Sequence, residues 1–190
     1  MFIEVENFLE EFHVNEIERF LSSVNFPWYY NPSISGAADK LHYDNDSNIK
    51  DVDGFVHRFS DNNNILSSHS EIIKIILNAI EQKLNFVIKD IRRSRAVLIY
   101  KNPSFGNFYQ VPHTDYTDPH LTLIYYVNDS DGDTVFFNEM YEEGNVEKKT
   151  LYKKITPKKG KCVVFDGLRY HTGSVPTDKN RILININFLL

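Results

Sequence analysis

Residues 181–189 read Arg-Ile-Leu-Ile-Asn-Ile-Asn-Phe-Leu, and their alternation shows the pattern that decides the fold. Isoleucine or phenylalanine occupies every even-numbered position from 182 to 188, whereas leucine and two asparagines occupy the odd positions between them. Successive side chains of a strand point to opposite faces of its sheet. The stretch is therefore predicted to be a strand with one buried face and one largely polar face.

Similar segments recur beyond Arg95, where the apolar period changes from about 3.6 to 2. They are short, rich in β-branched and aromatic residues, and separated by Gly, Pro, Asn and Asp. The predicted strands are Ala96–Tyr100, Leu121–Asn128, Thr134–Phe137, Thr150–Ile155, Cys162–Phe165 and Arg181–Leu189. Short strands at this spacing predict a β-sandwich or barrel.

The front half of the chain is expected to supply two helices. Apolar residues recur at helical spacing in Asn15–Ser23, with Asn15 as the predicted N-cap, and in Ser70–Leu84, with Ser70 as the N-cap. Both helices are expected to lie against one sheet. We therefore predict one domain over residues 1–190, with a helical and β front at 1–95 and a catalytic β-core at 96–190.

The composition excludes several classes of protein. The 190 residues include 21 basic and 26 acidic side chains, and this formal charge of −5 disfavours a protein that coats nucleic acid. No apolar run approaches the roughly 20 residues that span a bilayer, and the first residues do not resemble a signal peptide. Cys162 is the single cysteine, so we expect no internal disulfide and a cytoplasmic location. The oligomeric state is left open.

The chemistry is concentrated in Pro112-His113-Thr114-Asp115. In an extended segment, residues i and i+2 point to the same side, so His113 and Asp115 can reach one ion. His171 follows a later predicted strand and can supply a third ligand. Two imidazoles and one carboxylate, with other positions open, form the ligand set of iron(II) oxygenases. We predict that His113, Asp115 and His171 bind one metal ion.

Arg181 follows His171 by ten positions and begins the last predicted strand. A buried arginine is uncommon unless it is paired, and a dicarboxylate would pair with it through two parallel hydrogen bonds. Between the HxD motif and His171, Asp131-Gly132-Asp133 forms a predicted turn into the strand of Thr134 and Phe136.

These ordered motifs resemble those of the 2-oxoglutarate- and iron(II)-dependent dioxygenases of the prolyl 4-hydroxylase-like branch. The resemblance covers roughly Ala96 to Phe188 and rests on a tyrosine-bearing strand, HxD, a glycine-containing turn, and a histidine followed by a basic residue. It implies a double-stranded β-helix, which is a jelly-roll or cupin-like barrel that is mainly β with flanking helices. The turn departs from the family, in which two glycines are frequent.

The resemblance also implies cofactors and roles for individual residues. Arg181 and Tyr126 would hold the distal carboxylate of 2-oxoglutarate, and Tyr100 would touch this co-substrate near the metal. Thr122 shares a strand face with Tyr126 and would line the pocket. The implied cofactors are Fe(II), 2-oxoglutarate and O2, with ascorbate as a candidate reductant. The implied reaction hydroxylates an unactivated C–H bond, with a peptidyl prolyl or another amino-acid residue as candidate substrate, and releases succinate and CO2.

Other interpretations of the sequence stay open. The protein could be a cupin-like metal- or sugar-binding domain without oxygenase activity, or a structural β-sandwich with incidental histidines. Arg181 disfavours the first, because a plain binder needs no clamp for a dicarboxylate. His120 is expected at the surface or rim. The remaining histidines are expected to be solvated or hydrogen-bonded; they are His13, His42, His57 and His69.

The substrate is expected to be a peptide or a small molecule, with nucleic acid least favoured and no membrane partner. The aromatic cluster Phe26-Pro27-Trp28-Tyr29-Tyr30 is interpreted either as core packing or as a wall of the substrate entrance. The polar segment Asp39–Asp53 is a candidate lid that would govern the substrate together with Trp28 and Tyr29.

Overall fold

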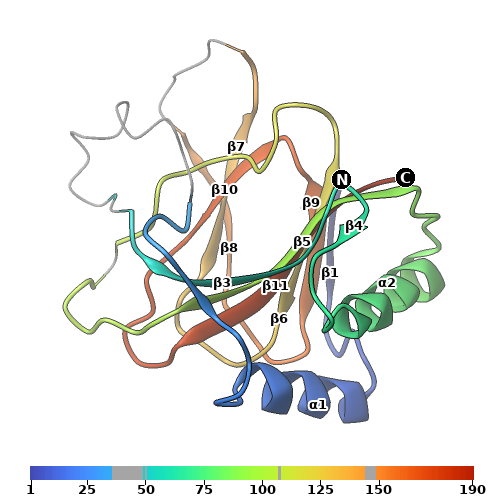
Figure 1. Cartoon of the computed structure of the whole chain (residues 1–190). Helices are drawn as coiled ribbons and strands as arrows, with labels where there is room; N and C mark the ends of the chain where they lie inside the picture. The colour runs from blue at the N-terminus through green and yellow to red at the C-terminus, as the bar shows by residue number, and fades with distance from the viewer. Residues whose placement is uncertain (36–48, 50, 107, 144–148) are drawn as a thin grey trace.

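The computed structural model describes the chain except for residues 36–48, 50, 107 and 144–148 (Figure 1). The described elements, in chain order, are β1 (Phe2–Val5), α1 (Glu11–Leu21), β2 (Tyr29–Asn31), β3 (Gly54–Asp61), β4 (Asn64–Ile65), α2 (Glu71–Leu84), β5 (Asp90–Ile99), β6 (Leu121–Tyr126), β7 (Thr134–Met140), β8 (Leu151–Ile155), β9 (Cys162–Asp166), β10 (Arg169–Gly173) and β11 (Arg181–Leu189).

Two antiparallel sheets form the body of the molecule. The large sheet has the order β1-β9-β6-β11-β5-β3-β2, with β4 paired to β3, and the small sheet has the order β10-β7-β8. Helices α1 and α2 cover the face of the large sheet that points away from the small sheet (Figure 1). The predicted fold, a mainly β jelly-roll with helices against one sheet, is confirmed.

Both faces of the large sheet are buried, because its central strands carry apolar side chains on alternating sides. Leu98 of β5 packs in the layer under the helices with Ile76 of α2, whereas its neighbour Val97 packs between the sheets with Phe136 of β7. Burial of one such side chain stabilises the fold by about 1.5–3 kcal/mol. β11 is buried along nearly its whole length, so its polar face looks into the interior.

The two predicted helices form, with one corrected start. α1 begins at Glu11, and Asn15, which was predicted as the N-cap, lies inside the helix. The reason is that Val14 joins Ile17 and Leu21 on the buried face, which extends the apolar stripe toward the N-terminus. Ser70 is the N-cap of α2, but its side chain makes no capping hydrogen bond. Neither described helix is long and apolar enough to cross a membrane.

The front half contributes more strand than the sequence predicts. β3 pairs along β5, and β5 starts at Asp90, well before the predicted start at Ala96. The sequence does not predict this pairing, because polar residues interrupt the apolar pattern of both strands. Ser60 of β3 and Ser94 of β5 are both buried, and their hydroxyl oxygens lie 2.6 Å apart. Because these hydroxyls satisfy each other only across the two strands, no local pattern reveals them. β1, β2, β4 and β10 are likewise additional strands.

Asp131 holds the turn that leads into β11. Its carboxylate accepts hydrogen bonds from the backbone N–H groups of Thr177, Asp178 and Lys179 and from the Thr177 hydroxyl. Burial raises the pKa of this carboxyl, but the hydrogen bonds outweigh that effect and hold its pKa well below the usual 3.8. The turn therefore depends on the ionised form of Asp131.

We expect Asp131→Ala to lower the free energy of unfolding by about 1–2 kcal/mol at neutral pH, because hydrogen bonds to a solvent-exposed carboxylate are weakened by water. A lowered folded-state pKa means that the stabilisation is complete above the unfolded value and is lost as the pH falls through the folded value. The difference from the parent should therefore shrink in acid below the usual pKa. Urea unfolding from neutral pH down to acid measures this difference in stability, with Asp178→Ala as the control. Equal stability of Asp131→Ala and parent at neutral pH would contradict the prediction.

Candidate metal centre

The HxD segment lies beside β10. The N–H of His113 donates to the carbonyl oxygen of His171 at 2.9 Å, and the N–H of His171 donates back to that of His113 at 3.0 Å. The N–H of Gln110 donates to the carbonyl of Gly173 at 2.9 Å and extends this pairing. The backbone of the HxD segment thus continues the edge of the small sheet and places His113 next to His171.

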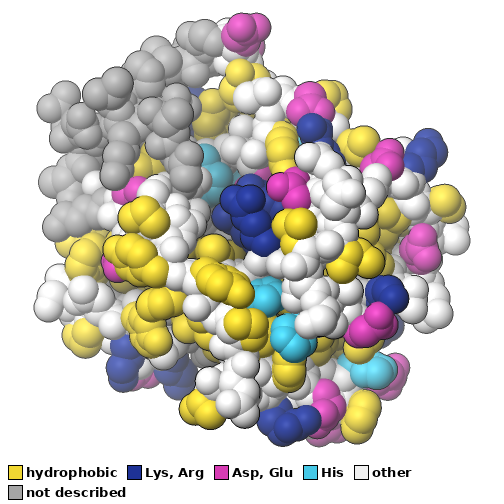
Figure 2. All heavy atoms as spheres, viewed as in Figure 1, with side chains coloured by type: hydrophobic (Ala, Val, Ile, Leu, Met, Phe, Trp, Pro, Cys, Tyr) yellow, Lys and Arg dark blue, Asp and Glu magenta, His cyan; other side chains and the backbone are white. Residues whose placement is uncertain are grey.

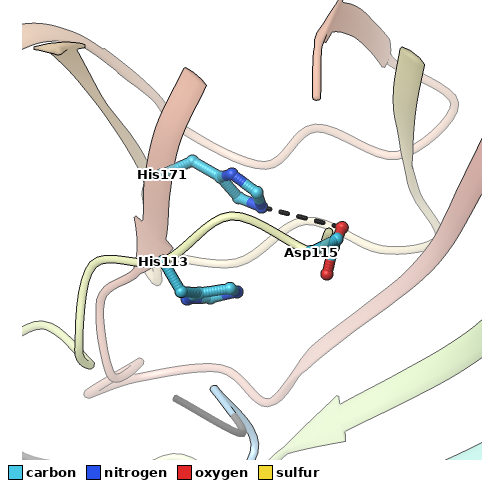
Figure 3. A group of neighbouring side chains, drawn as sticks. All are labelled: His113, Asp115 and His171. Carbon is cyan, nitrogen blue, oxygen red and sulfur yellow. Dashed lines mark ion pairs between the residues drawn. The ribbon is translucent and has the colours of Figure 1, made fainter. Parts of the chain in front are cut away.

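The side chains of His113, Asp115 and His171 converge on one point (Figure 3). Their ligand atoms all lie within 4.8 Å of one another, and Nε2 of His171 is 4.0 Å from Oδ2 of Asp115. Nδ1 of each histidine is close to a backbone carbonyl, at 2.9 Å from Val111 and 3.1 Å from Arg169. These contacts favour the tautomer with the proton on Nδ1, which leaves each Nε2 lone pair for a metal ion.

The electrostatics of the triad suit a divalent cation. Burial lowers the pKa of His113, and burial together with the neighbouring His113 lowers the pKa of His171 to about 4. Burial raises the pKa of Asp115, but Arg93, His171 and Arg95 outweigh it and hold that pKa well below its usual value. At neutral pH the site therefore presents two neutral imidazoles and one carboxylate.

Asp115 is oriented by groups that the sequence reasoning missed. Asn187 and Asn185 of β11 donate to its Oδ2 through Nδ2 at 2.8 and 3.2 Å, and Arg93 of β5 donates to its Oδ1 at 2.5 Å. Both asparagines are buried. The sequence indicates only that these amides need hydrogen-bond partners, because they make up most of the polar face of β11; it does not indicate that the partner is Asp115.

We expect Asn187→Ala to weaken metal binding by about 10- to 100-fold, because groups that orient a ligand usually contribute that much. The mutation removes the 2.8 Å hydrogen bond to Asp115 and leaves all three ligands in place. Titration of the purified protein with cobalt(II), followed by absorption, measures the affinity, and a thermal melt confirms the fold. Asn138→Ala, at an exposed position of β7, is the matched control. Unchanged cobalt affinity in Asn187→Ala would contradict this role.

A small cavity of about 50 Å³ adjoins the triad. Its walls combine the triad, the apolar side chains Val97, Ile124 and Leu183, and at one side Thr134 and Arg181. Arg181 is 4% exposed and donates through Nη2 to Oγ1 of Thr134 at 2.7 Å. No carboxylate among the described residues forms an ion pair with Arg181, and its Nε has no hydrogen-bond partner within that part of the chain.

Two glycines leave room for the Arg181 side chain. A Cβ atom at Gly173 would lie 2.6 Å from Nη1 of Arg181, and a Cβ at Gly132 would lie 3.1 Å from its Cδ. The turn Asp131-Gly132-Asp133 therefore contributes to the site. Gly132 packs against the side chain of Arg181, and the Asp131 carboxylate stabilises the turn that precedes Arg181.

The residues of this site fit an iron(II) ion and a dicarboxylate. The donor set of two imidazoles and one carboxylate is the one that iron(II) oxygenases use. A buried guanidinium without an acidic partner is costly unless a ligand supplies one. Both groups border the same cavity, so a dicarboxylate could reach the metal with one end and Arg181 with the other.

The three further predicted site residues occupy different places. Tyr126 is fully buried, and its hydroxyl donates at 2.7 Å to the Thr134 oxygen that also accepts from Arg181. Thr122 lies behind Asp115 and accepts from Nδ2 of Asn187 at 2.9 Å. Neither side chain is among those that line the small cavity. Thr134, which the sequence placed after the turn without a role, stands between Tyr126 and the cavity.

Tyr100 is not brought to the site. It follows the last residue of β5, is 55% exposed, and packs edge-on against Phe55. Side chains of β5 alternate, and Val97 and Ile99 are the ones that face the space between the sheets. The tyrosine is thus one position out of step with the strand face that borders the cavity.

His120 is a correction, because it was expected at the surface or rim and is 5% exposed. Its Nδ1 lies 2.8 Å from the carbonyl oxygen of Asp118, and its ring fills the space at Gly167, where a Cβ would meet Nε2 at 2.1 Å. His57 is hydrogen-bonded through both ring nitrogens, to Pro27 and Ser67. No histidine outside the triad joins a metal-binding group in the described residues, and His42 lies outside them.

Two members of the aromatic cluster of the front half, Phe26 and Trp28, pack in the core. Phe26 is buried and contacts Trp28 edge-on, and Nε1 of Trp28 donates to the carbonyl of Leu21 in α1. Trp28 therefore belongs to the layer under the helices, so the interpretation as an entrance wall is wrong for this residue. Tyr29 is 61% exposed on β2. Most of the candidate lid Asp39–Asp53 lies outside the described residues.

A comparison with known families gives one match. The family model described as the 2OG-Fe(II) oxygenase superfamily matches residues 96–189, which include the whole triad and Arg181. No curated protein sequence matches the chain. The family match favours an oxygenase over the cupin-like binder and the structural sandwich.

Solved structures share the fold at low sequence identity. A 2OG-Fe(II) oxygenase family oxidoreductase from Burkholderia pseudomallei has a TM-score of 0.66 at 14% identity, with 98% of this chain and 84% of that chain covered. A prolyl hydroxylase from Trichoplax adhaerens, in complex with a hypoxia inducible factor peptide, has a TM-score of 0.62 at 15% identity, with 99% of this chain and 83% of that chain covered. The α-ketoglutarate-dependent epimerase SnoN from nogalamycin biosynthesis has a TM-score of 0.64 at 13% identity, with 99% of this chain and 78% of that chain covered.

Proposed function

We propose that the chain is a member of the 2OG-Fe(II) oxygenase superfamily, whose model matches residues 96–189, and that it hydroxylates an unactivated C–H bond at a centre formed by His113, Asp115 and His171. The family uses Fe(II), 2-oxoglutarate and O2. The observation that carries the proposal is the convergence of the three ligand atoms within 4.8 Å. Their protonation states support it, because both imidazoles are neutral and Asp115 is ionised at neutral pH.

Arg181 is proposed to bind the distal carboxylate of 2-oxoglutarate. Its guanidinium is buried and lacks an acidic partner among the described residues, and it can offer two parallel N–H groups to a carboxylate. Thr134 receives hydrogen bonds from both Arg181 and Tyr126. Tyr126 would thus support the clamp through Thr134, and its own contact with the co-substrate remains a prediction.

The protein's part in the reaction is to position groups and to exclude water. When bound, iron(II) and 2-oxoglutarate supply the oxidising chemistry, with succinate and CO2 as the products of the co-substrate. Val97, Ile124 and Leu183 give the cavity an apolar wall that limits access of water to the reacting centre. Asn185, Asn187 and Arg93 keep the Asp115 carboxylate in a fixed orientation. No side chain is required as an acid or base.

The proposed substrate is a peptide or a small molecule, and a peptidyl prolyl residue is one candidate. The Trichoplax relative is a prolyl hydroxylase in complex with a peptide, whereas SnoN is an epimerase of nogalamycin biosynthesis. Because the fold supports different substrates and outcomes, it does not identify the substrate of this chain. The net charge of −5 makes nucleic acid the least favoured choice.

Anaerobic titration tests the proposal without knowledge of the substrate. Addition of iron(II) and 2-oxoglutarate to the protein should produce the visible charge-transfer absorption of an iron(II)–keto-acid chelate. Subsequent exposure to oxygen should convert 2-oxoglutarate into succinate, measured by mass spectrometry. A parent protein that binds neither iron(II) nor 2-oxoglutarate would contradict the proposed function.

A further inference from the structure

The cavity in front of the triad is basic. It has a volume of about 370 Å³, and the described residues that line it include Arg58, Arg93 and Arg95, with Asp115 as the single acidic residue among them. Figure 2 shows basic side chains gathered beside a histidine near the centre of one face. The Asp115 carboxylate already accepts a hydrogen bond from Arg93 and is a candidate metal ligand. The cavity therefore has surplus positive charge, which attracts anionic ligands.

Arg95 forms an ion pair with Asp115 but makes no hydrogen bond to a carboxylate among the described residues. Its side chain is 14% exposed and lines both the small and the larger cavity. Its Nη2 is 3.7 Å from Oδ1 of Asp115, which is beyond hydrogen-bond distance, and its Nε has no partner among the described residues. A guanidinium that is largely removed from water without acceptors is costly, so an oxygen-bearing ligand would stabilise it.

The other arginines of the site differ from Arg95 in hydrogen bonding or in exposure. Arg93 donates to Asp115 at 2.5 Å, and Arg181 lies at the other side of the small cavity with Thr134. Arg58 is 58% exposed and forms a long ion pair with Asp61 at 3.7 Å. Of the two arginines without a hydrogen-bonded carboxylate, Arg95 is the less exposed and lies beside the triad, whereas Arg58 adds positive charge where the cavity meets solvent.

We propose that the substrate is a small acid whose carboxylate or phosphate group binds Arg95, with Arg58 strengthening its attraction into the cavity. The proposal rests on the proposed oxygenase function, because it concerns the substrate of the same centre. Both anions match the planar fork of a guanidinium. Because Arg95 lies 3.7 Å from Asp115, the acid group would be only a few bonds from the reacting carbon. A cavity of about 370 Å³ also suits a small molecule.

Matched acids and amides test the proposal on the parent protein. The protein is loaded with manganese(II) and 2-oxoglutarate without oxygen, which fills the metal and co-substrate sites. It is then titrated at constant ionic strength with propionate, propionamide and inorganic phosphate by calorimetry. Propionate or phosphate should bind at least tenfold more tightly than propionamide, and the tighter anion identifies carboxylate or phosphate as the recognised group. Equal affinity of all three probes would overturn the proposal.

Variants then assign the effect to Arg95. Arg95→Gln, loaded with saturating manganese(II) and 2-oxoglutarate, should lose at least tenfold in affinity for the preferred anion. Arg95→Lys, which keeps the charge and loses the fork, should retain part of the affinity, and it replaces the glutamine variant if that protein does not fold. Arg19→Gln, at an exposed position of α1, should bind as the parent does. Undiminished anion affinity in Arg95→Gln and Arg95→Lys would contradict the assignment.

The outcomes separate this proposal from the proposed function. A parent that binds neither manganese(II) nor 2-oxoglutarate would overturn the proposed function. A parent that binds both, but does not distinguish propionate from propionamide, would overturn only the substrate class. C-amidated peptides without acidic side chains provide the last arm: if they stimulate succinate formation and free acids do not, the substrate is a peptide and the small-acid proposal fails.

Discussion

His171→Ala is expected to lose iron-dependent conversion of 2-oxoglutarate by more than about 100-fold, because loss of groups that only orient a ligand already reduces metal affinity or activity by 10- to 100-fold. The same loss is expected for His113→Ala and Asp115→Ala. Metal affinity should fall most for the two histidines, whose Nε2 atoms face the centre. Succinate formation measures turnover, and cobalt(II) titration measures metal binding.

The histidine prediction needs a control for loss of fold. His171 and Asp115 are buried, so each variant should first be compared with the parent by thermal melting. His13→Ala, on α1 and distant in sequence from the triad, should keep full metal binding. Full turnover in a folded His171→Ala protein would refute the assignment of this residue as a ligand.

Arg181→Ala should raise the apparent dissociation constant of 2-oxoglutarate by at least about 30-fold, because removal of one partner of a buried charge pair costs about 2–5 kcal/mol. Metal binding should change little, since Arg181 is not one of the ligands. Tyr126→Phe should have a smaller effect in the same direction. It removes one hydrogen bond, to Thr134, which is worth about 1 kcal/mol. Anaerobic titration of the iron-loaded proteins with 2-oxoglutarate measures both constants.

Arg181→Lys and a shorter keto acid sharpen the test of the clamp. Lysine keeps the charge without the fork and should give an intermediate affinity. The parent should prefer 2-oxoglutarate over pyruvate, which has no distal carboxylate, and Arg181→Ala should lose most of that preference. If Arg181→Ala bound 2-oxoglutarate as tightly as the parent does, the role of Arg181 as the clamp would be wrong.

The fold class follows from patterns that are local in the sequence. The alternation in Arg181–Leu189 and the helical stripe in Ser70–Leu84 depend only on how side chains alternate within one element, and both elements form as predicted. β3 and the first residues of β5 escaped detection because Ser60 and Ser94 are polar and satisfy each other only across two strands. Asn15 was mistaken for a cap because the apolar face of α1 begins earlier, at Val14.

The site divides in the same way. His113, Asp115 and His171 could be named as candidate ligands from residue type and order, because the chemistry of an iron ligand set restricts both. The groups that support Asp115 could not, since Asn185, Asn187 and Arg93 lie far from it in sequence and meet it only when β5 and β11 pair beside the HxD segment. Tyr100 does not lie at the site, because successive side chains of a strand point to opposite faces and Tyr100 is one position beyond Ile99, which faces inward.

The sequence by itself indicated the three candidate ligands, the arginine that follows the second histidine, and a sandwich or barrel of short strands, because each depends on residue chemistry or on a local period. The jelly-roll class followed from the family resemblance. The tertiary structure alone decided which of two neighbouring arginines hydrogen-bonds to Asp115. Arg93 and Arg95 look equivalent in the sequence, two positions apart on one strand. Asp115 is hydrogen-bonded to Arg93 at 2.5 Å and lies 3.7 Å from Arg95, although both arginines line the cavity. That difference arises from the positions of neighbouring strands, so only the folded chain contains it.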